Sequence, residues 1–150
     1  SLSHGADTIR LQDELHILDS YLAICRLRFD SQLDIRMDIG PETVELYVPK
    51  LIIQPFIENA VFHGNAGSIQ MSARCVEDHL LIMIQDDGTG MNEEQIRSAI
   101  AGNQDGKHAL QNIQRRLRLR YGEPYGLSIE SQPGQGTTVT LTLPCQRELP

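Results

Sequence analysis

Residues 86–91 read Asp86-Asp87-Gly88-Thr89-Gly90-Met91, and they follow the apolar run Leu80-Leu81-Ile82-Met83-Ile84 after a single glutamine. In a strand, Asp86 has the parity of Ile82 and Ile84, so we expect its carboxylate on the core face of the sheet. An ionised carboxylate directed inward needs hydrogen-bond partners. The two glycines permit positive φ angles and the close approach of a ligand to the backbone. The segment therefore predicts a site for a flat polar ligand, with an ordinary aspartate–glycine turn as the alternative.

The size and charge of the chain limit the classes of function. It has 150 residues, 40% of them hydrophobic, which suffices for one domain with a buried core. The formal net charge of −7 gives no broad positive field, so no nucleic-acid partner is expected. The arginine-rich segment 115–120 is a local exception, and we interpret it as a solvated helix face.

The cysteines indicate a reducing compartment. Cys25, Cys75 and Cys145 are odd in number and lie far apart, without the spacing of a zinc site. We therefore expect a cytoplasmic location.

The longest apolar runs are too short to span a bilayer. Because the chain lacks an initiator methionine, we expect it to be a soluble fragment of a longer protein, and a membrane anchor in that parent is compatible with this expectation.

The first thirty residues predict one long amphipathic helix. Ile17, Tyr21 and Ile24 widen its apolar surface, so the helix is expected to pack on the domain and to face a second element as well. We divide the chain into a linker helix, 1–30, and a domain, 31–150. The apolar positions that recur at four- and three-residue steps are Leu11, Leu15, Leu18, Leu22, Cys25 and Phe29.

The remaining patterns predict an α+β fold, a two-layer sandwich in which helices cover one face of a mixed, mostly antiparallel sheet. Pro55 is expected to kink the helix that contains it. Asn92 is expected to cap the helix that follows it. The expected elements are a strand at 33–39, a short strand or extended connection at 44–48, a helix from 49 to about 63, paired strands at 68–76 and 79–86, a helix at 93–101, a mobile loop at 101–107, a helix ending at Gly122, and strands at 127–131 and 138–143.

Three further segments carry residues suited to binding phosphate or metal. Glu58-Asn59-Ala60-Val61-Phe62-His63-Gly64 ends an apolar helix, although Asn59 and His63 could equally be ordinary buried polar groups. Gly106-Lys107-His108-Ala109-Leu110-Gln111-Asn112 is a glycine-marked loop that enters a helix, and helix N-termini bind phosphate. Gly134-Gln135-Gly136-Thr137 is, taken singly, typical of a hairpin turn.

Together and in this order, the four segments resemble the ATP-binding domain shared by gyrase, the heat-shock chaperone, histidine kinases and the mismatch-repair ATPase. Residues 58–64 are similar to its N box, and 86–90 to its first glycine box. Residues 106–112 are similar to its second glycine box, and 134–137 to its last box. The resemblance implies a Bergerat-type ATP-binding fold with ATP and Mg²⁺ as cofactors.

Other sequence segments resemble one branch of that superfamily, the LytS/YesM type of bacterial sensor histidine kinase. The resemblance extends from about Leu11 to Pro144. It implies transfer of the ATP γ-phosphoryl group to a histidine outside this chain. The segments are Tyr21-Leu22-Ala23-Ile24 with Arg28-Phe29, Pro49-Lys50-Leu51-Ile52-Ile53-Gln54-Pro55, and Asn112-Ile113-Gln114-Arg115-Arg116-Leu117 with Tyr121-Gly122.

The resemblance also implies roles for single residues. Asp86 would accept a hydrogen bond from the adenine amine, and Gly90 would let the base lie against the backbone. Asn59 would supply an oxygen to Mg²⁺, and Glu58 would orient a water or act as a base, which makes these two the catalytic pair. The implied cofactor-binding residues are Asn59, His63, Asp86, Gly88, Gly90, Met91, Gly106, Lys107, Ala109, Leu110 and Thr137.

The implied phosphate end has a lid and two departures from the family pattern. Residues 102–107 would be the lid, and the amides near Ala109 and Leu110 would reach the phosphates. Phe62 stands where the family often has a basic residue, and Ala109 where it commonly has glycine. Phe62 would therefore remove one expected phosphate contact, whereas we interpret Ala109 as subtype variation, with Lys107 as the candidate to restore positive charge. His63 is interpreted as a structural histidine at the helix end rather than a catalytic one.

The phosphoacceptor histidine of this family lies in a Phe-rich helix motif that the chain lacks, and His4 and His16 have no such context. We therefore expect the chain to bind ATP without autophosphorylating alone. The implied partners are the dimerisation hairpin that the linker helix would continue, a second subunit in a homodimer, and a response regulator. Two alternatives are an ATP-hydrolysing conformational switch driven by Glu58, and a degenerate nucleotide sensor or dimerisation module, suggested by Phe62 and Ala109.

Overall fold

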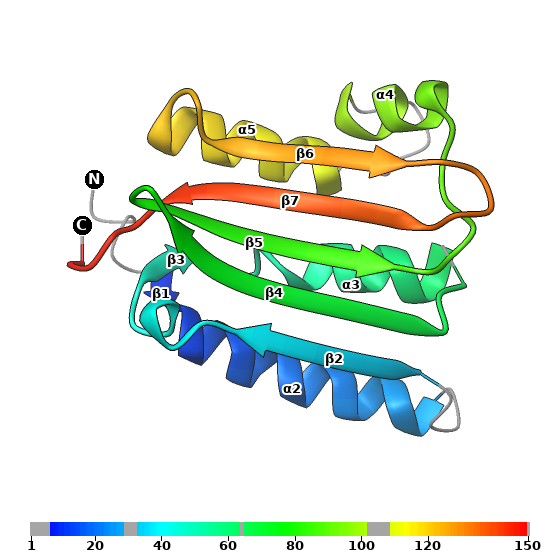
Figure 1. Ribbon diagram of the computed structural model, residues 1–150, viewed down its shortest axis with the longest axis horizontal. Coiled ribbons are helices and arrows are strands. Elements are labelled where there is room, and N and C mark those ends of the chain that lie inside the picture. Colours follow the sequence, from blue (N-terminus) through cyan, green and yellow to red (C-terminus); the bar gives the residue numbers. More distant parts are fainter. Residues whose placement is uncertain (1–6, 29–32, 64, 102–108, 150) are drawn as a thin grey trace.

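A computed structural model describes residues 7–28, 33–63, 65–101 and 109–149 (Figure 1). The predicted lid at 102–107 therefore lies outside the described residues. The helices and strands are β1 (Thr8–Arg10), α2 (Leu11–Arg28), β2 (Asp34–Ile39), a 3₁₀ turn η1 (Pro41–Thr43), β3 (Tyr47–Pro49), α3 (Gln54–Glu58), a π-helical turn η2 (Asn59–His63), β4 (Ser68–Val76), β5 (His79–Asp86), α4 (Glu93–Ala101), α5 (Ala109–Tyr121), β6 (Gly126–Ser131) and β7 (Thr137–Pro144).

The main sheet has five strands in the order β2-β4-β5-β7-β6. Strands β2 and β4 run parallel, and the other neighbouring pairs are antiparallel. Figure 1 shows α2, α3, α4 and α5 on one side of this sheet. The prediction of a two-layer α+β fold with a mixed, mostly antiparallel sheet is confirmed.

Strand alternation decides which face of the sheet is buried. Leu80, Ile82 and Ile84 of β5 are buried, and Asp86 continues the same parity at the end of the strand. The β4–β5 hairpin closes on Glu77 and Asp78, which have φ angles of 51° and 68°. Two successive residues with positive φ suit the twist of a two-residue hairpin. The predicted pairing of these strands is confirmed, and it places the Asp86 segment at one end of the sheet.

Helix α2 is packed into the same core as the sheet. Leu11, Leu18, Leu22 and Cys25 are each at most 3% exposed, whereas Leu27 on the opposite side of the helix is 86% exposed. The amide of Leu11 also donates to the carbonyl of Leu46 at 2.8 Å. The helix therefore covers the domain with one face. Its role as a linker to a further element stays a prediction.

Glu14 is a buried carboxylate that links α2 to the turn before α3. It is 3% exposed, and its two oxygens accept hydrogen bonds from the amides of Leu51 at 3.0 Å and Ile52 at 2.8 Å. Leu51 has a φ angle of 59°, a conformation that costs a non-glycine residue free energy. Glu14 thus holds an otherwise unfavourable turn in place.

We expect Glu14→Gln to destabilise the domain by about 1–3 kcal/mol, because the glutamine amide would turn a donor toward one of the two N–H groups. For a chain of this size, the melting temperature should fall by about 2–4 °C per kcal/mol. Thermal unfolding followed by circular dichroism measures the shift. Asp19→Asn, on an exposed position of α2, is the matched control, and an equal shift in both variants would contradict the assigned role.

The turn held by Glu14 also corrects the predicted helix at 49–63. Helix α3 begins at Gln54, so Pro55 lies in its first turn and not in its interior. Proline is tolerated there because the first amides of a helix have no intrahelical partner. The expected kink at Pro55 is therefore wrong. The helix instead widens into the π-helical turn η2 at Asn59.

Strand β1 was missed by the sequence analysis. Its three residues pair antiparallel with β3, with Thr8 opposite Pro49 and Arg10 opposite Tyr47. Three residues are too few to show an alternating pattern. The other strand and helix boundaries agree with the expected ones to within a few residues, including the stop of α5 before Gly122, whose φ angle is 72°.

Candidate functional site

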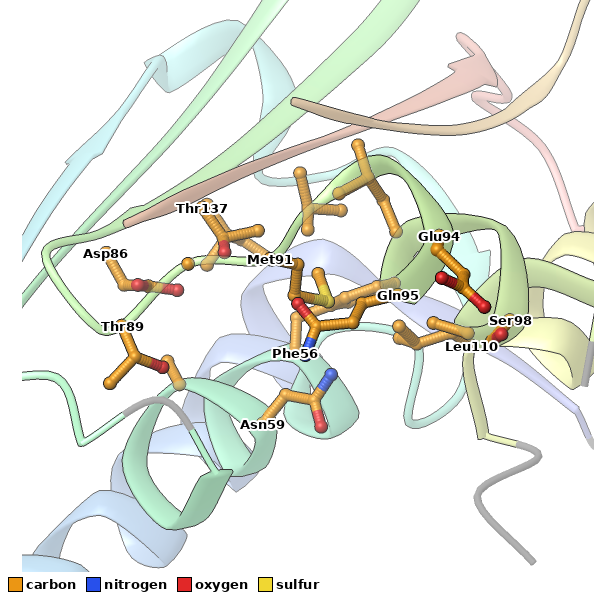
Figure 2. A pocket seen from close by; sticks show the side chains of 16 residues that line it. Phe56, Asn59, Asp86, Thr89, Met91, Glu94, Gln95, Ser98, Leu110 and Thr137 are labelled. Atoms are coloured by element: carbon orange, nitrogen blue, oxygen red, sulfur yellow. The ribbon is translucent and has the colours of Figure 1, made fainter. Parts of the chain in front are cut away.

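A cavity of about 470 Å³ lies between the core face of the sheet and the helices (Figure 2). Elements distant in sequence contribute to it: α3, η2, β5 and the loop after it, α4, α5, β6 and β7. The lining residues are Phe56, Asn59, Ala60, Ile84, Asp86, Thr89, Gly90, Met91, Glu94, Gln95, Ser98, Ala99, Leu110, Ile129, Thr137 and Val139.

Asp86 is the acidic group at one end of this cavity. Figure 2 shows it beside Thr89 and Thr137, with Glu94 and Leu110 at the far side of the cavity. One carboxylate oxygen accepts a hydrogen bond from the amide of Gly88 at 2.8 Å. Burial raises the pKa of Asp86, and the amides of Gly88 and Thr137 offset this only in part. The fold therefore holds a carboxylate where ionisation is less favourable than in water, as expected for a group that recognises a ligand.

Gly90 and Gly136 allow two loops to lie against each other. Their φ angles are 72° and 80°. A Cβ atom on Gly90 would collide with the carbonyl of Gln132, and one on Gly136 with the carbonyl of Asp86. Both positions therefore need glycine for the contact between the loops, a requirement in addition to the ligand approach that we expected at Gly90.

Hydrogen bonds fasten the same two loops. The amide of Gly134 donates to the carbonyl of Thr89 at 2.7 Å, and the amide of Met91 donates to Ser131 Oγ at 2.7 Å. Ser131 Oγ also donates to the carbonyl of Gly136 at 2.8 Å and lies 2.8 Å from Thr137 Oγ1. The loop after β5 is thus attached to the β6–β7 hairpin beside Asp86.

Of the two neighbouring residues Asn59 and Glu58, only Asn59 lies in the wall of the cavity. Asn59 lines the cavity, and Figure 2 shows it on the helical wall. Glu58 is not among the lining residues, and its carboxylate accepts a hydrogen bond from the side-chain amide of Gln54 at 3.0 Å. Only the backbone of His63 is described, at the end of η2. The roles implied for these three residues stay predictions.

The other predicted site residues have different positions. Met91, Leu110 and Thr137 line the cavity, and Gly88 contributes through its amide to Asp86. Ala109 is the first residue of α5, so the first turn of this helix begins beside the cavity wall at Leu110. Gly106 and Lys107 lie outside the described residues.

One wall of the cavity was missed by the sequence analysis. Glu94, Gln95, Ser98 and Ala99 form one side of α4 and line the cavity. Their spacing of four residues would have placed them on one helix face, but polar residues on a helix normally face solvent. Asn92 caps this helix as predicted: its side-chain oxygen accepts from the amide of Gln95 at 2.8 Å, and its own amide donates to the Gln95 side chain at 2.8 Å.

A carboxylate, two packed glycine loops and a helix N-terminus around one cavity are the features that the Bergerat-type resemblance implied. A family model described as histidine kinase-, DNA gyrase B-, and HSP90-like ATPase matches residues 47–147. The match covers more than half of the chain, and the chain therefore belongs to this family of ATPases.

Among curated proteins, the chain is similar to sensor histidine kinases. It is 34% identical over 154 residues to sensor histidine kinase YesM of Bacillus subtilis, which covers 99% of this chain and 26% of that protein. It is 30% identical over 153 residues to sensor histidine kinase BtsS of Escherichia coli, with coverage of 99% and 26%. The chain thus spans about a quarter of the length of these relatives, and the predicted family is confirmed.

Solved structures share the fold. The catalytic domain of histidine kinase ThkA matches with a TM-score of 0.70 at 13% identity, covering 95% of this chain and 97% of that one. The ATP-binding domain of PrrB from Mycobacterium tuberculosis matches with a TM-score of 0.63 at 23% identity, covering 92% and 96%. The Bergerat-type fold is therefore confirmed.

Two features are absent from the part of the chain that the structure describes. Within 7–28, 33–63, 65–101 and 109–149, no three His, Cys, Asp or Glu side chains cluster as a metal site would require. In the same part of the chain, no helix is long and apolar enough to cross a bilayer.

Proposed function

We propose that this domain binds Mg·ATP in the cavity and supplies its γ-phosphoryl group to a histidine outside residues 1–150, in a two-component sensor histidine kinase. The observation that carries the proposal is the Asp86 carboxylate, held partly buried in the wall of the cavity and fixed by the amide of Gly88 at 2.8 Å. A purine with an exocyclic amine offers the donor that this acceptor lacks.

The apolar part of the lining supports a place for the base. Ile84, Met91 and Val139 line the cavity together with Asp86 and Thr137. A flat aromatic ring can bury its faces against such side chains while its polar edge meets the two polar groups. Asp86 would therefore set the orientation of the base, and the apolar side chains would supply most of the contact area.

The first turn of α5 supports a place for the phosphates. Leu110 lines the cavity in this turn, where free amides and the helix dipole attract anions. Asn59 would offer its amide oxygen to Mg²⁺, which prefers oxygen ligands and is usually held by few protein groups together with phosphates. The bound ion would neutralise phosphate charge during transfer. The absence of a larger acidic cluster among the described residues is compatible with this donor set.

The histidine that accepts the phosphoryl group would reach the cavity from the dimerisation hairpin that α2 continues, and a response regulator would then receive the phosphate. This sequence of partners rests on the relatives, which are sensor histidine kinases at 34% and 30% identity. We propose a cytoplasmic site of action, where ATP is available, and a homodimer in the full-length protein.

No observation favours the two alternatives. Hydrolysis driven by Glu58 would need its carboxylate at the phosphates, but this carboxylate accepts from Gln54 and does not line the cavity. A degenerate sensor was suggested by Phe62, which lacks the basic side chain common in the family. The guanidinium carbon of Arg28 lies 6.0 Å from the centroid of the Phe62 ring and brings a positive charge close to this position.

The test of the proposal is calorimetric titration of the domain with Mg·ATP, followed by a phosphorylation assay on the full-length protein. We expect saturable binding and an acid-labile phosphohistidine. Absence of binding by the wild-type domain would refute the proposed function. Binding without phosphohistidine in the full-length protein would leave a nucleotide-binding module.

Neighbouring residues of the same helix give a sharper test. We expect Glu58→Ala to change Mg·ATP affinity by no more than about threefold, because a side chain outside the cavity contributes little. Asn59→Ala should weaken it by about tenfold, because a liganding oxygen is lost. Calorimetry in Mg²⁺ measures both, and repeating it in EDTA should remove the difference. Steady ATP turnover by the isolated domain that Glu58→Ala abolishes would instead favour the hydrolase.

A further inference from the structure

Asp86, Thr137 and Ser131 stand in one row across three neighbouring strands. In the sheet register Asp86 of β5 is opposite Thr137 of β7, and Thr137 is opposite Ser131 of β6. Asp86 and Thr137 line the cavity, whereas Ser131 does not. The row therefore has two members that can touch a ligand and a third that reaches the ligand only through Thr137.

The hydrogen bonds of Ser131 fix the direction of the hydroxyl group on Thr137. A serine hydroxyl has one proton to donate and two lone pairs to accept with. Ser131 Oγ accepts from the amide of Met91 at 2.7 Å, and it donates to the carbonyl of Gly136 at 2.8 Å, since a carbonyl can only accept. The bond of 2.8 Å between Ser131 and Thr137 is satisfied when Thr137 is the donor.

This assignment leaves Thr137 with acceptor capacity only. Its single proton is directed at Ser131, so its oxygen presents lone pairs to the cavity. An ionised Asp86 carboxylate is also an acceptor. At this end of the cavity, β5 and β7 thus each offer an acceptor, Asp86 and Thr137 (Figure 2).

We propose that Ser131 is a positioning residue that keeps the Thr137 hydroxyl oxygen an acceptor beside Asp86 and thereby selects 6-aminopurine over 6-oxopurine nucleotides. The proposal rests on the proposed nucleotide function of the cavity. The amine at position 6 has two N–H groups, one for Asp86 and one for Thr137, whereas a carbonyl at position 6 would set its lone pairs against both acceptors. Without Ser131, the Thr137 hydroxyl would be free to rotate and donate to that carbonyl.

The surroundings prevent Ser131 from reversing its own hydrogen bonds. Both the Met91 amide and the Gly136 carbonyl belong to the backbone of loops that lie against each other at Gly90 and Gly136. A backbone amide can only donate and a backbone carbonyl can only accept. The orientation of the Ser131 hydroxyl is therefore determined by the fold, and the orientation of the Thr137 hydroxyl follows from it.

The experiment compares ATP with inosine triphosphate, which has a carbonyl in place of the 6-amine and a proton on N1. Dissociation constants of both Mg²⁺ complexes are measured by calorimetry at pH 7.5 on the wild-type domain and on Ser131→Ala. We expect the wild type to prefer ATP. In Ser131→Ala, the preference should fall by roughly three- to tenfold, the factor that one neutral hydrogen bond accounts for. If Ser131 had only a structural role, Ser131→Ala would weaken the binding of both nucleotides by the same factor.

A double-mutant cycle with Thr137→Val tests the route of the effect. Valine keeps the shape of threonine without the hydroxyl, so Ser131→Ala should not change the preference further in a Thr137→Val background. Ser131→Thr retains a hydroxyl and should retain the preference. Ser128→Ala, at an exposed position of the same strand, is the matched control for the serine change.

The outcomes separate this inference from the proposed function. A wild type that binds ATP and inosine triphosphate equally, or a preference that Ser131→Ala leaves unchanged, overturns the role of Ser131 and leaves ATP binding standing. A wild type that binds neither overturns both proposals. If Ser131→Ala does not unfold cooperatively, Thr137→Val alone decides the question. A larger loss of affinity for inosine triphosphate than for ATP in Thr137→Val would show that the Thr137 oxygen is not an acceptor and would overturn the proposal.

Discussion

Replacing Asp86 with asparagine is expected to weaken Mg·ATP binding about ten- to a hundredfold, because a hydrogen bond to an ionised group contributes roughly 1.5–3 kcal/mol. Asparagine keeps the size of the side chain and one oxygen that can accept from the amide of Gly88. Its N–H₂ group, however, would face the exocyclic amine of the base, so a donor would meet a donor. Calorimetric titration of the isolated domain measures the loss.

The neighbouring aspartate provides the control. Asp87 Oδ1 accepts from the amides of Gly67 and Ser68, each at 2.9 Å, and Asp87 does not line the cavity. Asp87→Asn keeps an acceptor oxygen for these amides, so its affinity for Mg·ATP should remain within about threefold of the wild type. If Asp86→Asn bound Mg·ATP with unchanged affinity, the Asp86 carboxylate would not recognise the nucleotide, and the main argument for the proposed function would fail.

The Asp86 variant should also change how stability depends on pH. Burial raises the pKa of Asp86 in the folded state above its ordinary value, so between the two pKa values the folded chain binds more protons than the unfolded chain. The contribution of this carboxyl to stability therefore decreases as the pH rises through that window. Without nucleotide, the melting temperature of Asp86→Asn minus that of the wild type should increase as the pH rises from 4 toward neutrality. A decrease of this difference would contradict the burial effect.

The position of Asp86 in the sheet and the end of α5 could be predicted from sequence because they depend on local features. The face of the sheet on which Asp86 lies follows from its parity with Ile84, and no other part of the chain is needed to infer it. The stop of α5 before Gly122 follows from glycine at a position with positive φ. Such inferences depend on residues close in sequence, and the structure agrees with them.

The features that were missed depend on contacts between distant segments. Glu14 looks like an ordinary residue in the first turn of a helix, and only the fold brings it to the amides of Leu51 and Ile52. For the same reason Pro55 was assigned to a helix interior, since the turn that delays α3 is held by Glu14. Ser131 resembles any serine before a hairpin until Met91 is placed beside it. Charge, parity and spacing contain no information about these contacts.

The hairpin at 132–136 offers the second large effect, because two of its glycines have the same backbone conformation but different space for a Cβ atom. Gly134 and Gly136 have φ angles of 79° and 80°. A Cβ atom on Gly134 would meet nothing within 4 Å, whereas one on Gly136 would collide with the carbonyl of Asp86. Gly134→Ala therefore isolates the cost of positive φ, about 1–2 kcal/mol. Gly136→Ala should add about 1–3 kcal/mol for the backbone displacement that the collision forces.

The two alanine variants should differ most in nucleotide binding. The residue that Gly136→Ala displaces is Asp86 itself, and Thr137 is the next residue in the chain, so both polar groups at this end of the cavity would move. A displacement of a fraction of an ångström suffices to weaken directional hydrogen bonds. We expect no measurable Mg·ATP binding by Gly136→Ala under conditions where it remains folded, and binding within about threefold of the wild type by Gly134→Ala. Equal affinities in the two variants would mean that the contact between the loops does not position Asp86, since backbone strain alone is common to both.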